Sequence, residues 1–119
     1  MIGQGAAIFG CEGAVLTARE KAFFAEYQPL GFILFARNVE NPDQLRRLTS
    51  DLRASVGRDA PILVDQEGGR VQRLRAPHWR EWAPPFDTVE RAGAKAPRAM
   101  ALRSMLIAAE LRAVGIHAN

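Results

Sequence analysis

Apolar residues gather in short runs separated by longer polar stretches, and this spacing predicts an alternation of strands and helices. Three of the runs are apolar on both faces, as the strands of a parallel sheet covered by helices must be. They are residues 6–9, 31–35 and 61–65. A fourth strand is predicted to begin at residues 116–119, the last residues of the sequence.

Polar signals mark the helices between these strands. Thr17 and Glu20 have the spacing of a capping box, which predicts a helix that starts after Thr17. Asn41 followed by Pro42 predicts the start of the next helix, and Gly57 its end. That second helix carries one apolar stripe, which consists of Leu45, Leu48, Leu52 and Val56.

The second half of the chain continues with a loop and a long helix. Residues 78–85 include Pro84-Pro85, which suits neither a helix interior nor a central strand and so predicts a loop. A helix is predicted over residues 97–114, closed by Gly115. Apolar side chains lie on one side of it: Leu102, Met105, Leu106 and Ala109.

The order of these elements predicts an α/β fold with a parallel sheet. Their period fits the βα units of a TIM (β/α)₈ barrel, of which this chain would supply about three to four. We therefore expect residues 1–119 to be the N-terminal part of a single barrel domain, cut within its fourth strand. Because such a part has unpaired strand edges, we predict that the chain alone is aggregation-prone or molten.

Composition narrows the class of protein. The sequence is 48% apolar and 24% charged, and no apolar run is long enough to predict a membrane helix. The first five residues lack the basic start and apolar core of a secretory signal. Cys11 is the single cysteine, which excludes an internal disulfide, fits a reducing compartment and predicts a buried, unreactive thiol. These features favour a cytoplasmic protein without a membrane partner.

The net charge of +3 has a local origin in a basic cluster. Four arginines fall within eleven residues: Arg70, Arg73, Arg75 and Arg80. A nucleic-acid surface is one interpretation of such a cluster. Acidic residues are interleaved with it and no aromatic alternation suggests base stacking, so we favour a solvated surface with a small site for anions or hydroxyls. No nucleic-acid partner is predicted.

The candidate chemistry lies in residues 65–73, where a carboxylate ends a strand and a Gly-Gly turn and two arginines follow. In parallel α/β folds, ligands bind at the carboxyl ends of the strands. Asp65 either caps its own turn, by accepting from the amides of Glu67 or Gly68, or accepts from two adjacent hydroxyls of a sugar. Arg73 is either a surface arginine or a fork of donors for the same ligand.

Glu67 invites a second interpretation, because an extended backbone would point it the same way as Asp65. Two carboxyls about 5 Å apart would suit a retaining glycosidase. The glycines bend the chain at once and Arg70 is close, so we expect Glu67 to form a structural ion pair with Arg70 instead. A metal site at Asp65 and Glu67 lacks a third ligand, and the spacing matches no phosphate loop. No metal or cofactor is predicted.

Two tryptophans follow in the predicted loop, Trp79 and Trp82. They either belong to the core or offer aromatic faces on which a sugar could stack.

Residues 64–74, VDQEGGRVQRL, closely resemble the bacterial β-N-acetylhexosaminidases of glycoside hydrolase family 3, which act in peptidoglycan recycling. Three more segments resemble the same family: residues 31–38, 77–80 and 110–116. The resemblance implies a TIM-barrel hydrolase that removes non-reducing terminal N-acetylglucosamine with retention, through a glycosyl-aspartate intermediate. It also implies that Asp65 and Arg73 hold the terminal sugar.

The family's catalytic groups, a His-Asp dyad on a mobile loop and a later nucleophilic Asp, match no position in this sequence. The resemblance therefore implies that the chain carries part of a sugar site but no catalytic residue, and that alone it hydrolyses nothing. The intact enzyme is expected to be a monomer that acts on a small muropeptide carbohydrate. The alternative is a catalytically inactive sugar-binding or regulatory module.

Overall fold

The computed structural model describes residues 5–119. The expectation about a signal peptide falls almost entirely on residues 1–4, outside the described residues. The first half contains β1 (Gly5–Phe9), α1 (Ala18–Tyr27), β2 (Pro29–Leu34), the short 3₁₀ turn η1 (Ala36–Asn38) and α2 (Pro42–Val56). The second half contains β3 (Ile62–Val64), β4 (Gln66–Gly68), β5 (Val71–Gln72), α3 (Pro85–Ala92), the 3₁₀ turn η2 (Gly93–Lys95) and α4 (Ala96–Arg112).

Strands β1, β2 and β3 form a parallel sheet in that order, which confirms the predicted α/β class. The register pairs Phe32 with Ile62 and Leu34 with Val64. The predicted fourth strand is present only as a single parallel bridge between Leu63 and Ala118. Closure into a barrel is not seen within residues 5–119, so the barrel remains an expectation.

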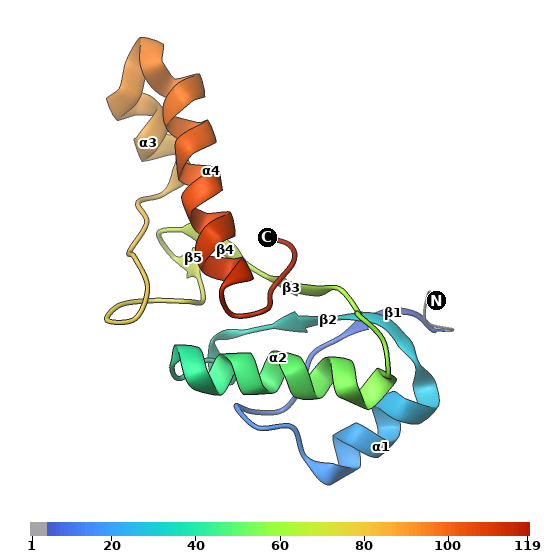
Figure 1. The fold of residues 1–119 in the computed structure, drawn as a ribbon. Helices are drawn as coiled ribbons and strands as arrows, with labels where there is room; N and C mark the ends of the chain where they lie inside the picture. Colours follow the sequence, from blue (N-terminus) through green and yellow to red (C-terminus); the bar gives the residue numbers. More distant parts are fainter. Residues whose placement is uncertain (1–4) are drawn as a thin grey trace.

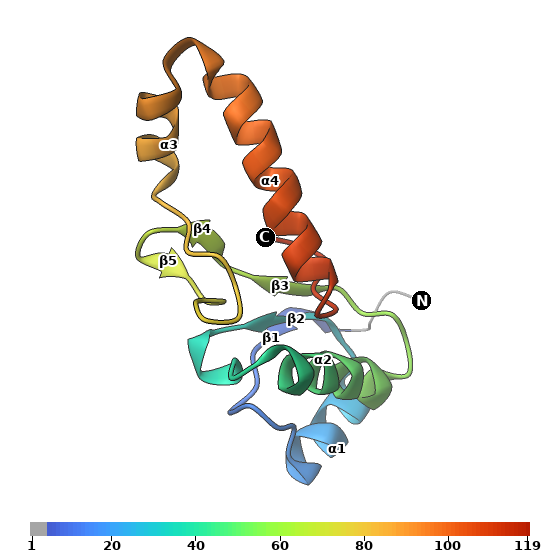
Figure 2. The ribbon, with the colours of Figure 1, turned by 60° about the vertical axis from the view of Figure 1, so that its left-hand side comes forward.

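Helices α1 and α2 cover one face of the sheet, whereas α3 and α4 project away beyond β3 (Figures 1 and 2). The projection makes the molecule elongated, with extents of 51 × 29 × 20 Å. The C-terminus lies between α4 and β3 (Figure 1). No helix within residues 5–119 is both long and apolar enough to cross a membrane.

The core lies between the sheet and α2 and is apolar, as the stripe on α2 predicts. Leu45, Leu48, Leu52 and Val56 are all buried, together with residues of β2 and β3. Burying one such side chain stabilises the fold by about 1.5–3 kcal/mol. The caps are also as predicted: Thr17 and Glu20 form the capping box of α1, and the Asn41 side chain accepts from the Gln44 amide at 2.9 Å.

Several predicted boundaries differ by one or two residues: β1 starts at Gly5, β3 spans Ile62–Val64 and α4 spans Ala96–Arg112. Two further boundaries are wrong at prolines. Strand β2 begins at Pro29 and ends at Leu34, instead of running over residues 31–35, because the first residue of a strand can lack an N–H. The predicted loop to Pro85 ends one residue earlier, because Pro85 is the first residue of the unpredicted helix α3. At that position the missing N–H breaks no helical hydrogen bond.

Helix α4 buries a different side from the apolar one that the sequence indicates. Leu102, Met105 and Leu106 are 43%, 67% and 45% exposed. The buried positions are Arg103, Ile107 and Leu111, which are four residues apart and so share one face. The apolar pattern predicted the wrong face of the helix because the buried face contains an arginine.

Candidate functional site

The chain leaves the sheet after β3 and folds back as the antiparallel hairpin β4–β5. The sequence indicated only a Gly-Gly turn here. Gly68 and Gly69 have φ angles of 104° and 60°, a backbone conformation that side chains other than glycine rarely adopt. A Cβ on Gly68 would also collide with the Ala83 carbonyl oxygen and the Arg103 guanidinium. The tight turn therefore returns Arg73 to the end of β3.

The hairpin brings together the two residues singled out from the sequence, Asp65 and Arg73. Arg73 Nη2 donates to Asp65 Oδ2 at 3.1 Å, and the two side chains are 27% and 41% exposed. Within residues 5–119, neither the Glu67 nor the Gly68 amide donates to this carboxylate, so the turn-capping interpretation is wrong. An exposed ion pair of this kind contributes at most about 1 kcal/mol to stability.

The pair lies on an open rim of the fold. Leu34 pairs with Val64, so Phe35 and Asp65 are the next residues along β2 and β3 at the same edge of the sheet. Among the grooves within residues 5–119 are four of 200–380 Å³, and neither Asp65 nor Arg73 lines these four. The carboxylate and guanidinium are half-buried and offer acceptors and donors to a ligand at this edge of the sheet.

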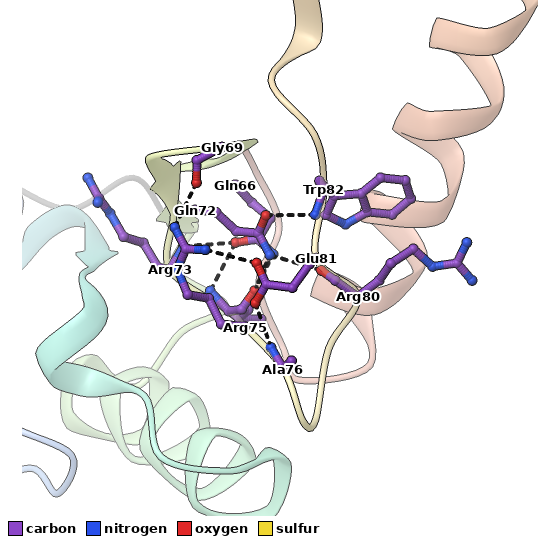
Figure 3. A network of polar contacts seen from close by, with 10 residues as sticks. Gln66, Gly69, Gln72, Arg73, Arg75, Ala76, Arg80, Glu81 and Trp82 are labelled. Atoms are coloured by element: carbon purple, nitrogen blue, oxygen red, sulfur yellow. Dashed lines mark hydrogen bonds and ion pairs between the residues drawn. The ribbon is translucent and has the colours of Figure 1, made fainter. Parts of the chain in front are cut away.

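Two buried glutamines hold the hairpin in place (Figure 3). Gln66 Oε1 accepts from the amides of both Arg73 and Leu74 at 3.0 Å, and its Nε2 donates to the Leu74 carbonyl at 2.8 Å. Gln72 Nε2 donates to the carbonyls of Leu74 and Arg80, and Gln72 Oε1 accepts from the Trp82 amide at 3.0 Å. Gln66, the residue directly after Asp65, therefore holds the backbone of Arg73 through its side chain.

The same end of β3 is also tied to Asn119, the last residue of the sequence. Asn119 Oδ1 accepts from the Gln66 amide at 2.8 Å, and Asn119 Nδ2 donates to the Gln66 carbonyl at 3.0 Å. These two hydrogen bonds follow directly after the parallel bridge between Leu63 and Ala118 and continue the contact between the two segments. Gln66, the first residue of the hairpin, is therefore held by both its backbone and its side chain.

Two of the four arginines in the basic cluster, Arg73 and Arg75, form ion pairs with carboxylates within the described residues. Arg75 Nη1 contacts Glu81 Oε2 at 2.9 Å, and Arg75 Nη2 donates to the Gly69 carbonyl at 2.7 Å (Figure 3). Arg73 is paired with Asp65, and the Arg80 guanidinium lies 5.3 Å from the centre of the Trp82 ring. This arrangement favours a small polar site over a continuous nucleic-acid surface.

The structure bears on two further expectations about this region. Within the described residues, no ion pair joins Glu67 to Arg70; both side chains are exposed, so that prediction is wrong. Trp79 is buried in the core, so the core interpretation is confirmed for this tryptophan. Trp82 is half-buried: it packs against the core and also lines a groove, so its role in stacking on a sugar stays a prediction. No group of three or more potential metal ligands occurs within residues 5–119.

Cys11 follows β1 at the same edge of the sheet and is buried, as predicted. Burial, with a smaller contribution from the Glu20 carboxylate, raises the pKa of the Cys11 thiol to about 11. Asn38 Nδ2 lies 3.3 Å from its sulfur. The thiol is therefore protonated at neutral pH and unsuited to nucleophilic chemistry.

Sequence reasoning missed three residues that shape the site: Gln66, Gln72 and Arg103. Each is polar and buried. Polar residues are mostly exposed in proteins, so their burial carries no signal in a single sequence. The strand alternation in β4, which buries Gln66 and exposes Glu67, was concealed because both residues are polar.

The chain is similar over nearly its whole length to β-hexosaminidases. It is 43% identical over 110 residues to the Beta-hexosaminidase of Methylococcus capsulatus, a match that covers 92% of this chain and 32% of that protein. With the Beta-hexosaminidase of Pseudomonas aeruginosa (strain LESB58), the identity is 40% over 116 residues, covering 95% and 33% of the two chains. A comparison with models of protein families found no match.

Solved structures give the same result. NagZ from Neisseria gonorrhoeae in complex with N-trifluoroacetyl-D-glucosamine superposes with a TM-score of 0.84 at 31% identity, covering 97% of this chain and 34% of that chain. A glycoside hydrolase family 3 β-N-acetylglucosaminidase from Paenibacillus sp. superposes with a TM-score of 0.77 at 26% identity, covering 92% and 21%. The resemblance to NagZ-like family 3 glycoside hydrolases is confirmed, and the chain spans about a third of the length of the curated relatives it matches.

Proposed function

We propose that this chain is the N-terminal part of a β-N-acetylhexosaminidase. The whole enzyme would remove non-reducing terminal N-acetylglucosamine from peptidoglycan fragments, with retention, as a cytoplasmic monomer with a TIM-barrel domain. The observation that carries the proposal is the Asp65–Arg73 pair at the carboxyl end of β3, in a chain similar to β-hexosaminidases. One similar protein was solved in complex with a glucosamine derivative.

The two residues would act by binding and orienting the terminal sugar. Asp65 would accept from adjacent hydroxyls, and Arg73 would both donate to the sugar and hold the carboxylate in place. Such contacts raise the rate when they fix the reacting bond in a productive geometry. Contacts that tighten as the sugar distorts toward the oxocarbenium-like transition state would contribute to kcat as well as to KM.

Bond cleavage would depend on groups outside residues 1–119. Retention requires a nucleophile and an acid/base on opposite sides of the anomeric carbon. Asp65 is committed to Arg73, and Glu67 lies on the same strand segment with an exposed side chain. These residues serve one side of a sugar, so we propose that both catalytic groups lie elsewhere in the intact enzyme.

The proposal is tested by titrating this sequence within a complete barrel with N-acetylglucosamine, followed by ¹⁵N NMR, because the chain alone is predicted to be aggregation-prone or molten. We expect binding that Asp65→Ala weakens at least about tenfold, because one hydrogen bond to a charged group contributes about 1.5–3 kcal/mol. Glu67→Ala is the matched control, since this neighbouring carboxylate is exposed. Equal affinities for wild type and Asp65→Ala would contradict the sugar-binding role.

A second measurement separates binding from catalysis. We expect the chain alone to leave a chromogenic N-acetyl-β-glucosaminide intact, and the same sequence within a complete barrel to hydrolyse it. Turnover by the chain alone that is lost in Asp65→Ala would refute the assignment of catalytic groups elsewhere. Binding without turnover in every longer form of the protein would identify the sugar-binding module instead.

A further inference from the structure

Arg103 on α4 is a buried arginine without a carboxylate partner. Its side chain belongs to a residue that is only 6% exposed, and no ion pair involves it within the described residues. Nη1 donates to Thr88 Oγ1 at 2.9 Å, and Nη2 donates to the Ala83 carbonyl at 2.7 Å and to the Glu67 carbonyl. The guanidinium also lies 5.3 Å from the centre of the Trp82 ring.

A buried cation that meets only neutral acceptors is an expensive way to stabilise a fold. Removing a charge from water costs several kcal/mol, and apolar side chains of similar volume often stabilise as well or better. Burial accordingly lowers the pKa of Arg103. A guanidinium, unlike a leucine side chain, makes directional hydrogen bonds, and its planar group can hold several acceptors in fixed positions at once. Arg103 thereby fixes the positions of β4, of α3 with the segment before it, and of α4 relative to one another.

A continuous set of contacts leads from Arg103 to the sugar-binding pair. The Glu67 carbonyl that it holds belongs to β4, next to Gly68, whose missing side chain leaves room for the guanidinium. The preceding residue, Gln66, accepts from the amide of Arg73, which in turn donates to Asp65. Displacing β4 would therefore move both partners of the pair.

We propose that Arg103 is a positioning residue for Asp65 and Arg73, which holds the hairpin in the geometry that binds the sugar. This inference rests on the proposed function, since it assigns Arg103 an effect on ligand binding through residues that it does not touch. A positioning role and a structural role predict different results. Loss of a structural role would change the amount of folded protein and leave the affinity of the folded molecules unchanged, whereas loss of a positioning role would change that affinity.

The test compares Arg103→Ala and Arg103→Lys in the same sequence within a complete barrel, with N-acetylglucosamine as the probe. NMR shifts report the affinity of folded molecules only. We expect Arg103→Ala to raise the Kd about tenfold, within the range for residues coupled through a network. Arg103→Lys should recover only part of the loss, because one ammonium cannot meet the three acceptors in a fixed plane. Arg98→Ala, an exposed arginine on the same helix, should leave the Kd unchanged.

Chemical rescue sharpens the test. Millimolar methylguanidinium should occupy the space left in Arg103→Ala and lower its Kd toward that of wild type, but should not rescue Asp65→Ala. An unchanged Kd in Arg103→Ala, with or without a lower thermal midpoint, would overturn the proposal. If Arg103→Ala does not fold, the same comparison is made with Arg103→Lys.

A readout without ligand separates this inference from the proposed function. If wild type does not bind N-acetylglucosamine, the proposed function fails. The positioning role is then judged from the Arg73 Nε–H signal and from hydrogen exchange at the Gly69 amide, which donates to the Trp82 carbonyl at 2.8 Å. Changes in both for Arg103→Ala but not for Arg98→Ala support it, and unchanged signals overturn it.

Discussion

The two sides of β3 are held together by different chemistry. Toward β2 and α2 the interior is mostly apolar, with Leu34, Leu45 and Ile62 completely buried. Toward the hairpin the interior is mixed: apolar residues such as Leu74 and Ile107 are buried there, together with the polar side chains of Gln66, Gln72 and Arg103. Apolar contacts are non-directional, whereas hydrogen bonds depend steeply on angle and distance. The first side therefore supplies stability, and the second fixes the orientation of the Asp65–Arg73 pair.

The largest expected effect is on the apolar side. Leu52→Ala should lower the free energy of unfolding by about 2–5 kcal/mol, because it leaves a cavity among side chains that cannot close it. Urea denaturation followed by circular dichroism measures the loss. Leu106→Ala is the matched control, since this leucine is 45% exposed and should cost less than about 0.5 kcal/mol. Similar losses in the two variants would contradict the assignment of the core.

An intermediate effect is expected on the polar side. Gln66→Ala leaves the amides of Arg73 and Leu74 without their buried acceptor and should cost about 1–3 kcal/mol. The loss should be local: hydrogen exchange should accelerate at these two amides and remain slow at Phe32 in β2. Glu67→Ala, on the exposed face of the same strand, is the control. Acceleration throughout the sheet would show that the two sides unfold as one unit.

The smallest effect is expected at the capping box of α1, a pair of polar residues, Thr17 and Glu20, at the start of a helix on the apolar side. Burial alone would raise the pKa of Glu20, but hydrogen bonds from the Thr17 and Glu12 amides lower it below its ordinary value of 4.5. Since the folded state favours the carboxylate, its contribution is complete above the ordinary pKa and is lost as the pH falls through the lowered one.

Glu20→Gln should therefore remove a small acid-dependent part of the stability, no more than about 1 kcal/mol because the site is largely exposed and screened. Unfolding curves at neutral pH and near pH 3 measure the difference. Glu26→Gln, at an exposed position of the same helix, is the control. If wild type and Glu20→Gln lose the same amount of stability on acidification, the proposed contribution of the Glu20 carboxylate is disproved.

The apolar side could be predicted from the sequence almost residue by residue. The stripe on α2, both of its caps and the three parallel strands follow from local patterns, because burial on that side selects apolar residues at fixed periods. The polar side could not. The hairpin β4–β5, the helix α3 and the inward face of α4 depend on polar residues and prolines whose neighbours are distant in sequence.

The candidate site divides in the same way. By itself, the sequence determined that a carboxylate ends β3 and that an arginine follows eight residues later, and it carried the family resemblance. Only the tertiary structure decided that the two residues meet, that Glu67 stays outside, and that Arg103 reaches β4 from 36 residues away. The physical reason is that apolar burial leaves a periodic trace in the chain, whereas a directional hydrogen bond needs only two residues that folding brings together.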